Sequence, residues 1–158
     1  MNDSIPQLGP HGHEYWMELA LREAARAAEE GEVPVGAVIV HNSMVVGRGY
    51  NRPEGLKDAT AHAEILAIGA ASETLGDWRL EDCTIYVTLE PCPMCAGAIV
   101  QARIPLLVYG APDPKAGACG TLYNIVDDPR LNHRVEVITG VMEEESAALL
   151  KAFFQHLR

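Results

Sequence analysis

Short β-branched runs alternate with longer segments of helical periodicity along this chain, and this alternation constrains the fold more than any other feature of the sequence. Five runs have the length and composition of buried strands: 33–40, 44–50, 83–89, 106–110 and 135–138. Four segments repeat apolar residues at helical spacing, and a short helix is expected in a fifth: 13–30, 61–75, 93–103, 143–157 and 122–127. Helices that alternate with strands pack in layers on one sheet. The sequence therefore predicts an α/β fold, a three-layer α/β/α sandwich with a central mixed five-stranded sheet.

Residues 13–158 are expected to form a single domain, preceded by a flexible leader at 1–12. A chain of 158 residues is long enough for one hydrophobic core, and no segment rich in proline, glycine or charge divides it. No apolar run approaches the roughly 18 residues of a membrane span, so no membrane association is expected. Four cysteines without a secretory signal are too few for a disulfide scaffold and indicate the reducing cytoplasm.

The charge balance excludes one broad class of binding protein. A net charge of −10 and a pI of about 4.9 argue against a uniformly basic surface that coats nucleic acid or an anionic membrane. Positive charge is instead local, in three segments with a net charge of +2 each: 48–57, 130–134 and 151–158. These segments predict a small, salt-sensitive basic rim beside the functional pocket on an otherwise acidic surface.

Two short motifs carry residues suited to chemistry, and each opens an expected helix. The first is Ala61-His62-Ala63-Glu64 and the second is Pro91-Cys92-Pro93-Met94-Cys95. One imidazole and two thiolates make three ligands for Zn²⁺ and leave the fourth tetrahedral position open. An open position is typical of catalytic rather than structural zinc, because the ion there activates a water molecule. His62, Cys92 and Cys95 therefore predict a catalytic site with one Zn²⁺.

Glu64 is a candidate proton shuttle at this site. A separation of two residues turns its side chain about 200° around a helix axis from His62, so the two would not normally share a face. With His62 in the first turn, however, the carboxylate can approach the same cavity from the side and act as a general acid and base.

Two less specific interpretations of these motifs stay open at this point. A CxxC pair alone is also a redox motif, and a buried histidine alone is more often a core residue than a ligand. A zinc-stabilised or redox module without enzymatic activity would satisfy either motif taken singly. The ordered combination H-x-E…P-C-x-x-C is more specific, because it is a signature of zinc-dependent nucleobase deaminases.

Beyond this signature, the sequence resembles the family of bacterial tRNA-specific adenosine deaminases, which have a cytidine-deaminase-like fold. The resemblance covers residues 13–158 and rests on the following segments: His13-Glu14-Tyr15-Trp16-Met17, Glu32-Val33-Pro34-Val35-Gly36-Ala37-Val38, Asn51-Arg52-Pro53, Thr60-Ala61-His62-Ala63-Glu64-Ile65, Tyr86-Val87-Thr88-Leu89-Glu90-Pro91-Cys92, Met94-Cys95-Ala96-Gly97-Ala98, Leu131-Asn132-His133-Arg134-Val135-Glu136 and Phe153-Phe154.

The resemblance implies an enzyme that hydrolyses the wobble adenosine of a tRNA anticodon stem-loop to inosine. It implies zinc on His62, Cys92 and Cys95, Glu64 as the general acid and base, and a cytoplasmic homodimer with one zinc ion per subunit. It also implies substrate-binding roles for five residues: Asn51 as a hydrogen-bonding partner of the target nucleotide, Val35 and Ala63 in the base pocket, and Asp113 and Asn132 in contact with RNA.

The alternative function is a zinc deaminase that acts on a free base or nucleoside, either guanine, cytosine or cytidine. Some segments depart from the family pattern, chiefly Pro112, Cys119 and Thr121-Leu122-Tyr123-Asn124. These departures concern contacts with RNA rather than the zinc motif. Cys119 is not expected to be a fourth ligand, because a fourth protein ligand would close the open position.

Overall fold

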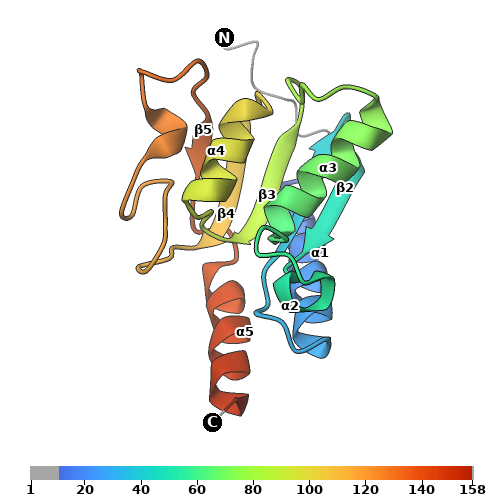
Figure 1. Ribbon diagram of the computed structural model, residues 1–158, viewed down its shortest axis with the longest axis vertical. Helices are drawn as coiled ribbons and strands as arrows, with labels where there is room; N and C mark the ends of the chain where they lie inside the picture. The colour runs from blue at the N-terminus through green and yellow to red at the C-terminus, as the bar shows by residue number, and fades with distance from the viewer. Residues whose placement is uncertain (1–10, 158) are drawn as a thin grey trace.

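The computed structural model describes residues 11–157, so most of the expected leader at 1–12 lies outside the described residues. Its elements form a five-stranded sheet of order β2-β1-β3-β4-β5 with helices on both faces (Figure 1), which confirms the predicted fold class. The strands are β1 (Gly36–His41), β2 (Met44–Tyr50), β3 (Thr84–Leu89), β4 (Leu106–Ala111) and β5 (Glu136–Ile138). The helices are α1 (His13–Glu29), α2 (Pro53–Leu56), α3 (Ala63–Leu75), α4 (Pro93–Gln101), α5 (Glu143–His156) and the 3₁₀ helix η1 (Ile125–Asp127).

The sheet is mixed, as predicted. Strand β1 pairs antiparallel with β2 and β3, whereas β3, β4 and β5 are parallel to one another. Because β1 is antiparallel to both of its neighbours, β2 and β3 run in the same direction and end at the same edge of the sheet. Helices α3 and α4 begin just beyond the carboxyl ends of β2 and β3, and this edge therefore receives both chemical motifs of the sequence.

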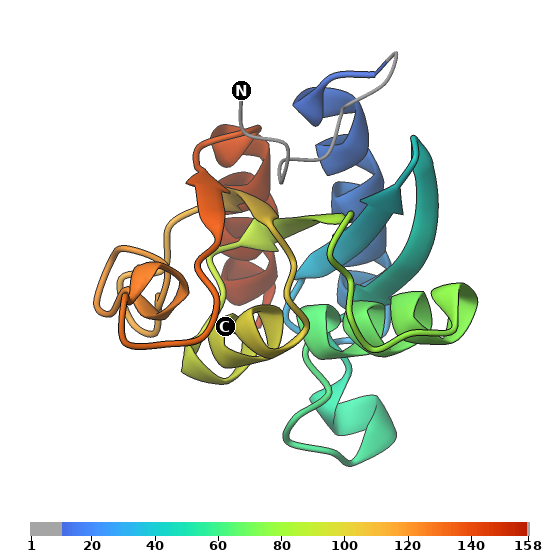
Figure 2. The same ribbon diagram turned by 90° about the horizontal axis from the view of Figure 1, so that it is seen from above.

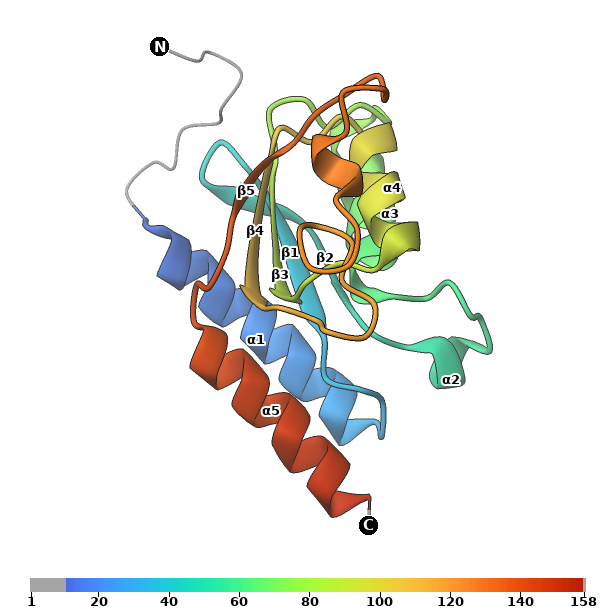
Figure 3. The same ribbon diagram turned by 90° about the vertical axis from the view of Figure 1, so that its left-hand side faces the viewer.

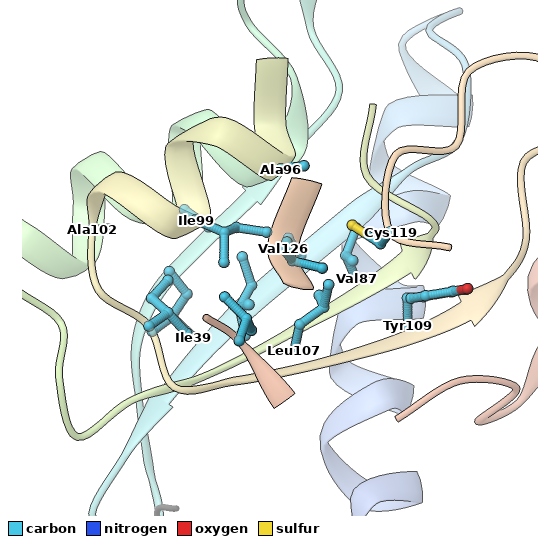
Figure 4. Close-up of a cluster of buried hydrophobic side chains, with 14 of the residues drawn as sticks. Ile39, Val87, Ala96, Ile99, Ala102, Leu107, Tyr109, Cys119 and Val126 are labelled. Carbon is cyan, nitrogen blue, oxygen red and sulfur yellow. The ribbon is translucent and has the colours of Figure 1, made fainter. Parts of the chain in front are cut away.

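The three layers separate clearly in Figures 2 and 3, with α1 and α5 on one face of the sheet and α3 and α4 on the other. Each interface has its own apolar core. Trp16, Met17 and Tyr86 belong to the core beneath α1, and Ile39, Ile99 and Leu107 to the core beneath α3 and α4. Figure 4 shows that Cys119 and Val126, from the long segment after β4, also pack into this second core.

Small residues let α3 lie directly on β2. A Cβ atom added at Gly49 would lie 2.5 Å from the carbonyl oxygen of Ala63, closer than atoms of this kind approach one another. The buried side of α3 consists of Ala63, Ala67 and Ala71 next to Glu64. Glycine on the strand and alanine on the helix thus set the position of the amino terminus of α3, which begins immediately after His62.

The structure differs locally from the prediction in three places. The loop expected after Asn51 contains α2, a single turn with Pro53 at its first position and Lys57 in the left-handed conformation at its end. Strand β1 begins at Gly36 rather than at 33, and only 125–127 of the short helix expected at 122–127 is helical. Within residues 11–157, none of the helices is both long enough and apolar enough to cross a membrane.

Candidate active site

The three expected metal ligands meet at the carboxyl edge of β2 and β3. His62 is the N-cap residue of α3 and Cys92 is the N-cap residue of α4, while Cys95 lies in the first turn of α4. The prediction that His62 lies inside the first helical turn is wrong, because its backbone is extended, with φ −78° and ψ 154°. This extended residue explains how His62 and Glu64 face one cavity although they are only two positions apart.

The donor set fits a zinc ion. The Nδ1 atom of His62 lies 3.6 Å from the Sγ atom of Cys92 and 3.6 Å from that of Cys95, and all three donor atoms lie within 4.8 Å of one another. Zinc–sulfur bonds of about 2.3 Å and zinc–nitrogen bonds of about 2.0–2.1 Å place the nitrogen and sulfur of a tetrahedral site about 3.6 Å apart. The nitrogen and sulfur atoms are therefore spaced as tetrahedral zinc requires.

The electrostatics of the two thiols favour metal binding. The hydrogen bond from the Cys95 thiol, supported by the imidazole of His62, lowers the pKa of Cys92 to about 4. The same hydrogen bond, in which the Cys95 thiol donates its proton to Cys92, raises the pKa of Cys95. Cys92 is thus a thiolate at neutral pH, and thiolates are the form of cysteine that ligates metals. The thiolate also lies at a helix N-terminus, where backbone N–H groups stabilise negative charge.

Glu64 lies in the same cavity but is not part of the ligand set. Its side chain is buried, at 4 % exposure, and burial raises its pKa to about 7. A carboxyl group that titrates near neutrality can both accept and release protons during a reaction at that pH. Desolvation of this kind, close to a metal-ligating cluster, is typical of functional carboxyl groups.

A pocket of about 220 Å³ opens beside these residues. His62, Glu64 and Cys92 form part of its wall, and the remaining lining residues are Val33, Val35, Asn51, Pro53, Leu89, Glu90, Asp113 and Ala116. Cavities that take drug-sized ligands measure about 300–1,000 Å³, so this pocket suits a single base. Three of the five expected substrate-binding residues, Val35, Asn51 and Asp113, are therefore brought together around it.

The other two residues expected to bind substrate, Ala63 and Asn132, are not among the residues that line the pocket. Ala63 is fully buried and contacts β2 from the first position of α3, so it does not line the pocket. Asn132 is exposed and precedes β5 at the opposite edge of the sheet, where the neighbouring His133 hydrogen-bonds the carbonyl of Ile104 at 2.7 Å. Cys119 is outside the ligand group of the described residues and belongs to the apolar core, as expected of a thiol that does not bind the metal.

Sequence reasoning assigned no role to Glu90, which also lines the pocket. The residue is 2 % exposed and accepts hydrogen bonds from the segment after β4, including the backbone N–H groups of Asp113 and Cys119, both at 3.0 Å. Burial opposes ionisation, but the hydrogen bonds from Thr121 and from the backbone lower the pKa of Glu90 overall. An acidic residue directly before Pro91 and Cys92 was the available signal, although sequence alone could not show what it contacts.

A basic rim adjoins the pocket at Arg52, the residue after Asn51. The guanidinium groups of Arg26 and Arg52 stack on the ring of Tyr50, at 4.9 and 5.0 Å from its centroid, and Arg48 lies beside them. Glu23 and Glu30 neutralise part of this charge through ion pairs with Arg26, Arg48 and Arg52. The rim thus carries three guanidinium groups and two carboxylates.

The described basic residues of the other two segments, Arg130, Arg134 and Lys151, lie on other elements than this rim. Arg130 and Arg134 form ion pairs with Asp128 and Asp127, at 2.7 and 2.9 Å, beside the opposite edge of the sheet. Lys151 is carried by α5, which covers the other face of the sheet and projects past the edge that holds the pocket (Figures 1 and 3). Among the described residues, only 48–57 of the three predicted segments supplies arginines to this rim, and Arg158 of 151–158 lies outside the described residues.

Comparisons with known proteins agree with this site. A family model described as MafB19-like deaminase matches residues 11–158. The tRNA-specific adenosine deaminase of Bacillus subtilis is 52% identical over 145 residues, which cover 92% of this chain and 90% of the relative. A solved structure from a study of A-to-I editing by tRNA:A34 deaminases at the wobble position of transfer RNA is 50% identical. It superposes with a TM-score of 0.83 over 86% of this chain and 99% of the other.

A more distant structure represents the alternative substrate class. The guanine deaminase from Nitrosomonas europaea is 26% identical and superposes with a TM-score of 0.73, over 96% of this chain and 88% of the other. This architecture is thus shared by a protein named as a guanine deaminase and by proteins named for tRNA. Identity is nevertheless about twice as high to the proteins named for tRNA.

Proposed function

This chain belongs to the deaminase family that includes the tRNA-specific adenosine deaminases, and on that premise we propose that it hydrolyses the wobble adenosine of a tRNA anticodon stem-loop to inosine. The observation that carries the proposal is the convergence of a zinc-type ligand set and a buried carboxyl group on a pocket of single-base size. The net reaction consumes adenosine and water and releases inosine and ammonia.

His62, Cys92 and Cys95 would hold Zn²⁺, which supplies Lewis-acid activation of water when bound. Glu64 accepts one proton of the attacking water, and the oxygen of that water forms a bond to C6 of the adenine. The same carboxyl group delivers this proton to N1 and then relays the remaining proton of the added oxygen to the departing amino group. The C6–N bond breaks, ammonia leaves, and the oxygen stays on the base. A single positioned carboxyl group with a pKa near neutrality suffices for these transfers.

The pocket walls hold the flipped base. We infer that the side-chain amide of Asn51 hydrogen-bonds the target nucleotide, that Val35 packs on the base, and that Asp113 faces the RNA from the opposite wall, because all three line the cavity. Extrusion of a base into such a pocket is the usual route for enzymes that modify bases. Asn132 contributes only if bound RNA reaches the opposite edge of the sheet, and Ala63 acts by seating α3 on β2.

Guanidinium groups at the basic rim pair with phosphates of the anticodon loop. Arg52 directly follows Asn51, so an RNA strand whose base enters the pocket passes beside Arg52 and Tyr50. Recognition of RNA combines such phosphate contacts with capture of an unstacked base. Residues 13–158 act as one domain, and the cytoplasm is the expected compartment because it contains tRNA and keeps the cysteine ligands reduced.

Two copies of the chain form a homodimer through the outer surface of α3 and α4. Helix α4 contains no charged residue, and its surface includes Gly97 and Ala98, which are half-buried. A helix that is apolar all round is normally covered on every side. The sheet, α3 and η1 each pack against α4, yet Gly97 and Ala98 stay partly exposed, so a second copy is the cover that we propose for them.

The oligomeric state tests this assignment directly. A Cβ atom at Gly97 would meet nothing within 4 Å, so Gly97→Glu adds a charge to the surface without disturbing the monomer. Light scattering should give twice the chain mass for the natural protein and for Gly97→Ala, and the monomer mass for Gly97→Glu. A natural protein that is monomeric at micromolar concentration would contradict the homodimer.

Substrate choice tests the proposed reaction. The purified protein should release ammonia and form inosine from an anticodon stem-loop with adenosine at the wobble position. It should release no ammonia from the same stem-loop with guanosine at that position. Metal analysis should find one zinc per chain, and removal of zinc by a chelator should abolish turnover until zinc is restored. Turnover of free guanine, cytosine or cytidine together with inactivity on the stem-loop would favour the alternative substrate class instead.

A further inference from the structure

The carboxylate of Glu90 is fully occupied by hydrogen bonds from one segment of the chain, 112–124, which leads away from β4. Its Oε1 atom accepts from the backbone N–H of Asp113 at 3.0 Å and from the hydroxyl of Thr121 at 2.5 Å. Its Oε2 atom accepts from the backbone N–H groups of Cys119 and Thr121 at 3.0 and 3.1 Å. A carboxylate offers about four acceptor positions, and all four are used.

Because all its acceptor positions are occupied, Glu90 is not suited to proton transfer in the reaction. Glu90 lines the same pocket as Glu64, yet its oxygens have no remaining position with which to accept a proton from water or substrate. It also forms no ion pair with a cation among residues 11–157, so its charge is balanced only by N–H and O–H dipoles. A buried carboxylate held in this way stays ionised at low cost only while all its donors are in place, because loss of the donors leaves an uncompensated buried charge.

The surrounding segment is shaped to admit this carboxylate. A Cβ atom at Gly117 would lie 2.5 Å from the Glu90 carboxyl group and 2.6 Å from the carbonyl of Asp113, so a larger residue there would displace the segment. The neighbouring Pro91 adds a backbone bond, in which its carbonyl accepts from the N–H of Ala118 at 2.9 Å. The segment 112–124 is therefore tied to the two residues that precede the expected metal ligand Cys92.

We propose that Glu90 is a positioning residue that fixes the RNA-facing wall of the pocket, formed by Asp113 and Ala116, relative to the metal ligands. The inference deepens the proposed function, because it assumes that this wall faces the anticodon loop. Loss of the carboxylate would loosen the wall and weaken substrate binding, while the metal site and the chemical step would stay intact.

The central test is the variant Glu90→Gln, which replaces one acceptor oxygen by an NH₂ group that faces N–H donors. We expect the backbone amides of Cys119 and Thr121 to exchange hydrogen at least tenfold faster. We also expect a KM for the stem-loop raised at least tenfold, kcat within threefold of the natural protein, and an unchanged zinc content. Thr121→Val removes a single donor and should move exchange and KM in the same direction by about threefold. The double variant should be no worse than Glu90→Gln alone, because both changes break the same contacts.

Glu136→Gln is the matched control, because this glutamate is exposed on β5 and should leave every readout unchanged. Unchanged exchange rates in both Glu90→Gln and Thr121→Val would overturn the proposal, as would a loss of zinc or a fall in kcat at constant KM. Should Glu90→Gln fail to fold, Thr121→Val alone decides between these outcomes. Exchange and zinc content are measured without substrate, so inactivity of the natural protein on RNA would overturn the proposed function and leave the test of the wall intact.

Discussion

Two glutamates line one pocket and differ in what surrounds their carboxyl groups. Glu64 lies in the first turn of α3 beside the ligand cluster, where burial raises its pKa to about 7. Glu90 sits at the end of β3, where donors from four groups keep it ionised. The same side chain is thus suited to proton transfer in one place and to holding a loop in the other, because burial dominates around Glu64 and hydrogen-bond donors dominate around Glu90.

Glu64→Gln should reduce kcat by about 10²–10⁴-fold, which is the usual contribution of a positioned general acid and base. Glutamine keeps the size and polarity of the side chain but cannot carry a proton between water and base. Zinc content and binding of the stem-loop should stay as in the natural protein, and single-turnover kinetics with metal analysis would measure both. Full activity of Glu64→Gln would contradict the assigned mechanism.

At this scale the sequence predicted the cluster of metal-type donors more directly than the placement of the expected substrate-binding residues. His62, Cys92 and Cys95 could be recognised because metal ligation demands specific residue types at specific spacings. The placement of Asn132 could not be derived, because it depends on which edge of the sheet the chain has reached before β5. Glu90 was missed for a related reason, since its partners lie 23 to 31 residues further along the chain.

Among the elements, the contact between β2 and α3 determines the geometry of the site. Gly49 on β2 lies against the backbone of Ala63 and Ala67 in the first turns of α3, which follows the expected ligand His62. Hydrophobic periodicity predicted both elements, but not how closely they pack, because the distance depends on the absence of a side chain on the strand. The single turn α2 was also not predicted, since four residues are too few to show periodicity.

Gly49→Ala should destabilise the protein by about 1–3 kcal/mol, because the added methyl group meets backbone rather than a flexible side chain. The displacement of α3 should also lower zinc occupancy. Gly69→Ala on the same helix is the matched control: its Cβ would meet nothing within 4 Å, and alanine in a helix is favoured by about 0.8–1.0 kcal/mol over glycine. Urea unfolding would measure the free energy of unfolding of both variants. A value for Gly49→Ala equal to that of the natural protein would refute this role of Gly49.

For the whole molecule, the charge distribution sets how RNA approaches. A net charge of −10 disfavours nucleic acid over most of the surface, whereas in the proposed function the three guanidinium groups around Tyr50, partly neutralised by Glu23 and Glu30, would attract it beside the pocket. Each phosphate neutralised on single-stranded RNA contributes about −0.7 to the slope of log affinity against log salt concentration.

Arg52→Ala should therefore weaken binding of the stem-loop at low salt and make the salt slope shallower by about 0.7. The control is Arg79→Ala, because Arg79 stacks on Trp78 in the turn between α3 and β3, at the edge of the sheet farthest from the pocket. Fluorescence titrations between low and physiological salt would measure both variants. Identical slopes for Arg52→Ala and the natural protein would show that the rim does not contact phosphate.

Strands β2 and β3 run in the same direction, so the turns that carry the expected metal ligands lie at one edge of the sheet. The difference between this edge and the opposite edge matters for protein engineering. Turns on the opposite edge, such as the one between α3 and β3, contribute no lining residue to the pocket. We expect a change in the length of such a turn, including insertion of a reporter domain, to leave the reacting groups in place. At the edge that holds both motifs, a residue inserted between His62 and α3 or between Cys92 and Cys95 is expected to move the imidazole away from the sulfur atoms.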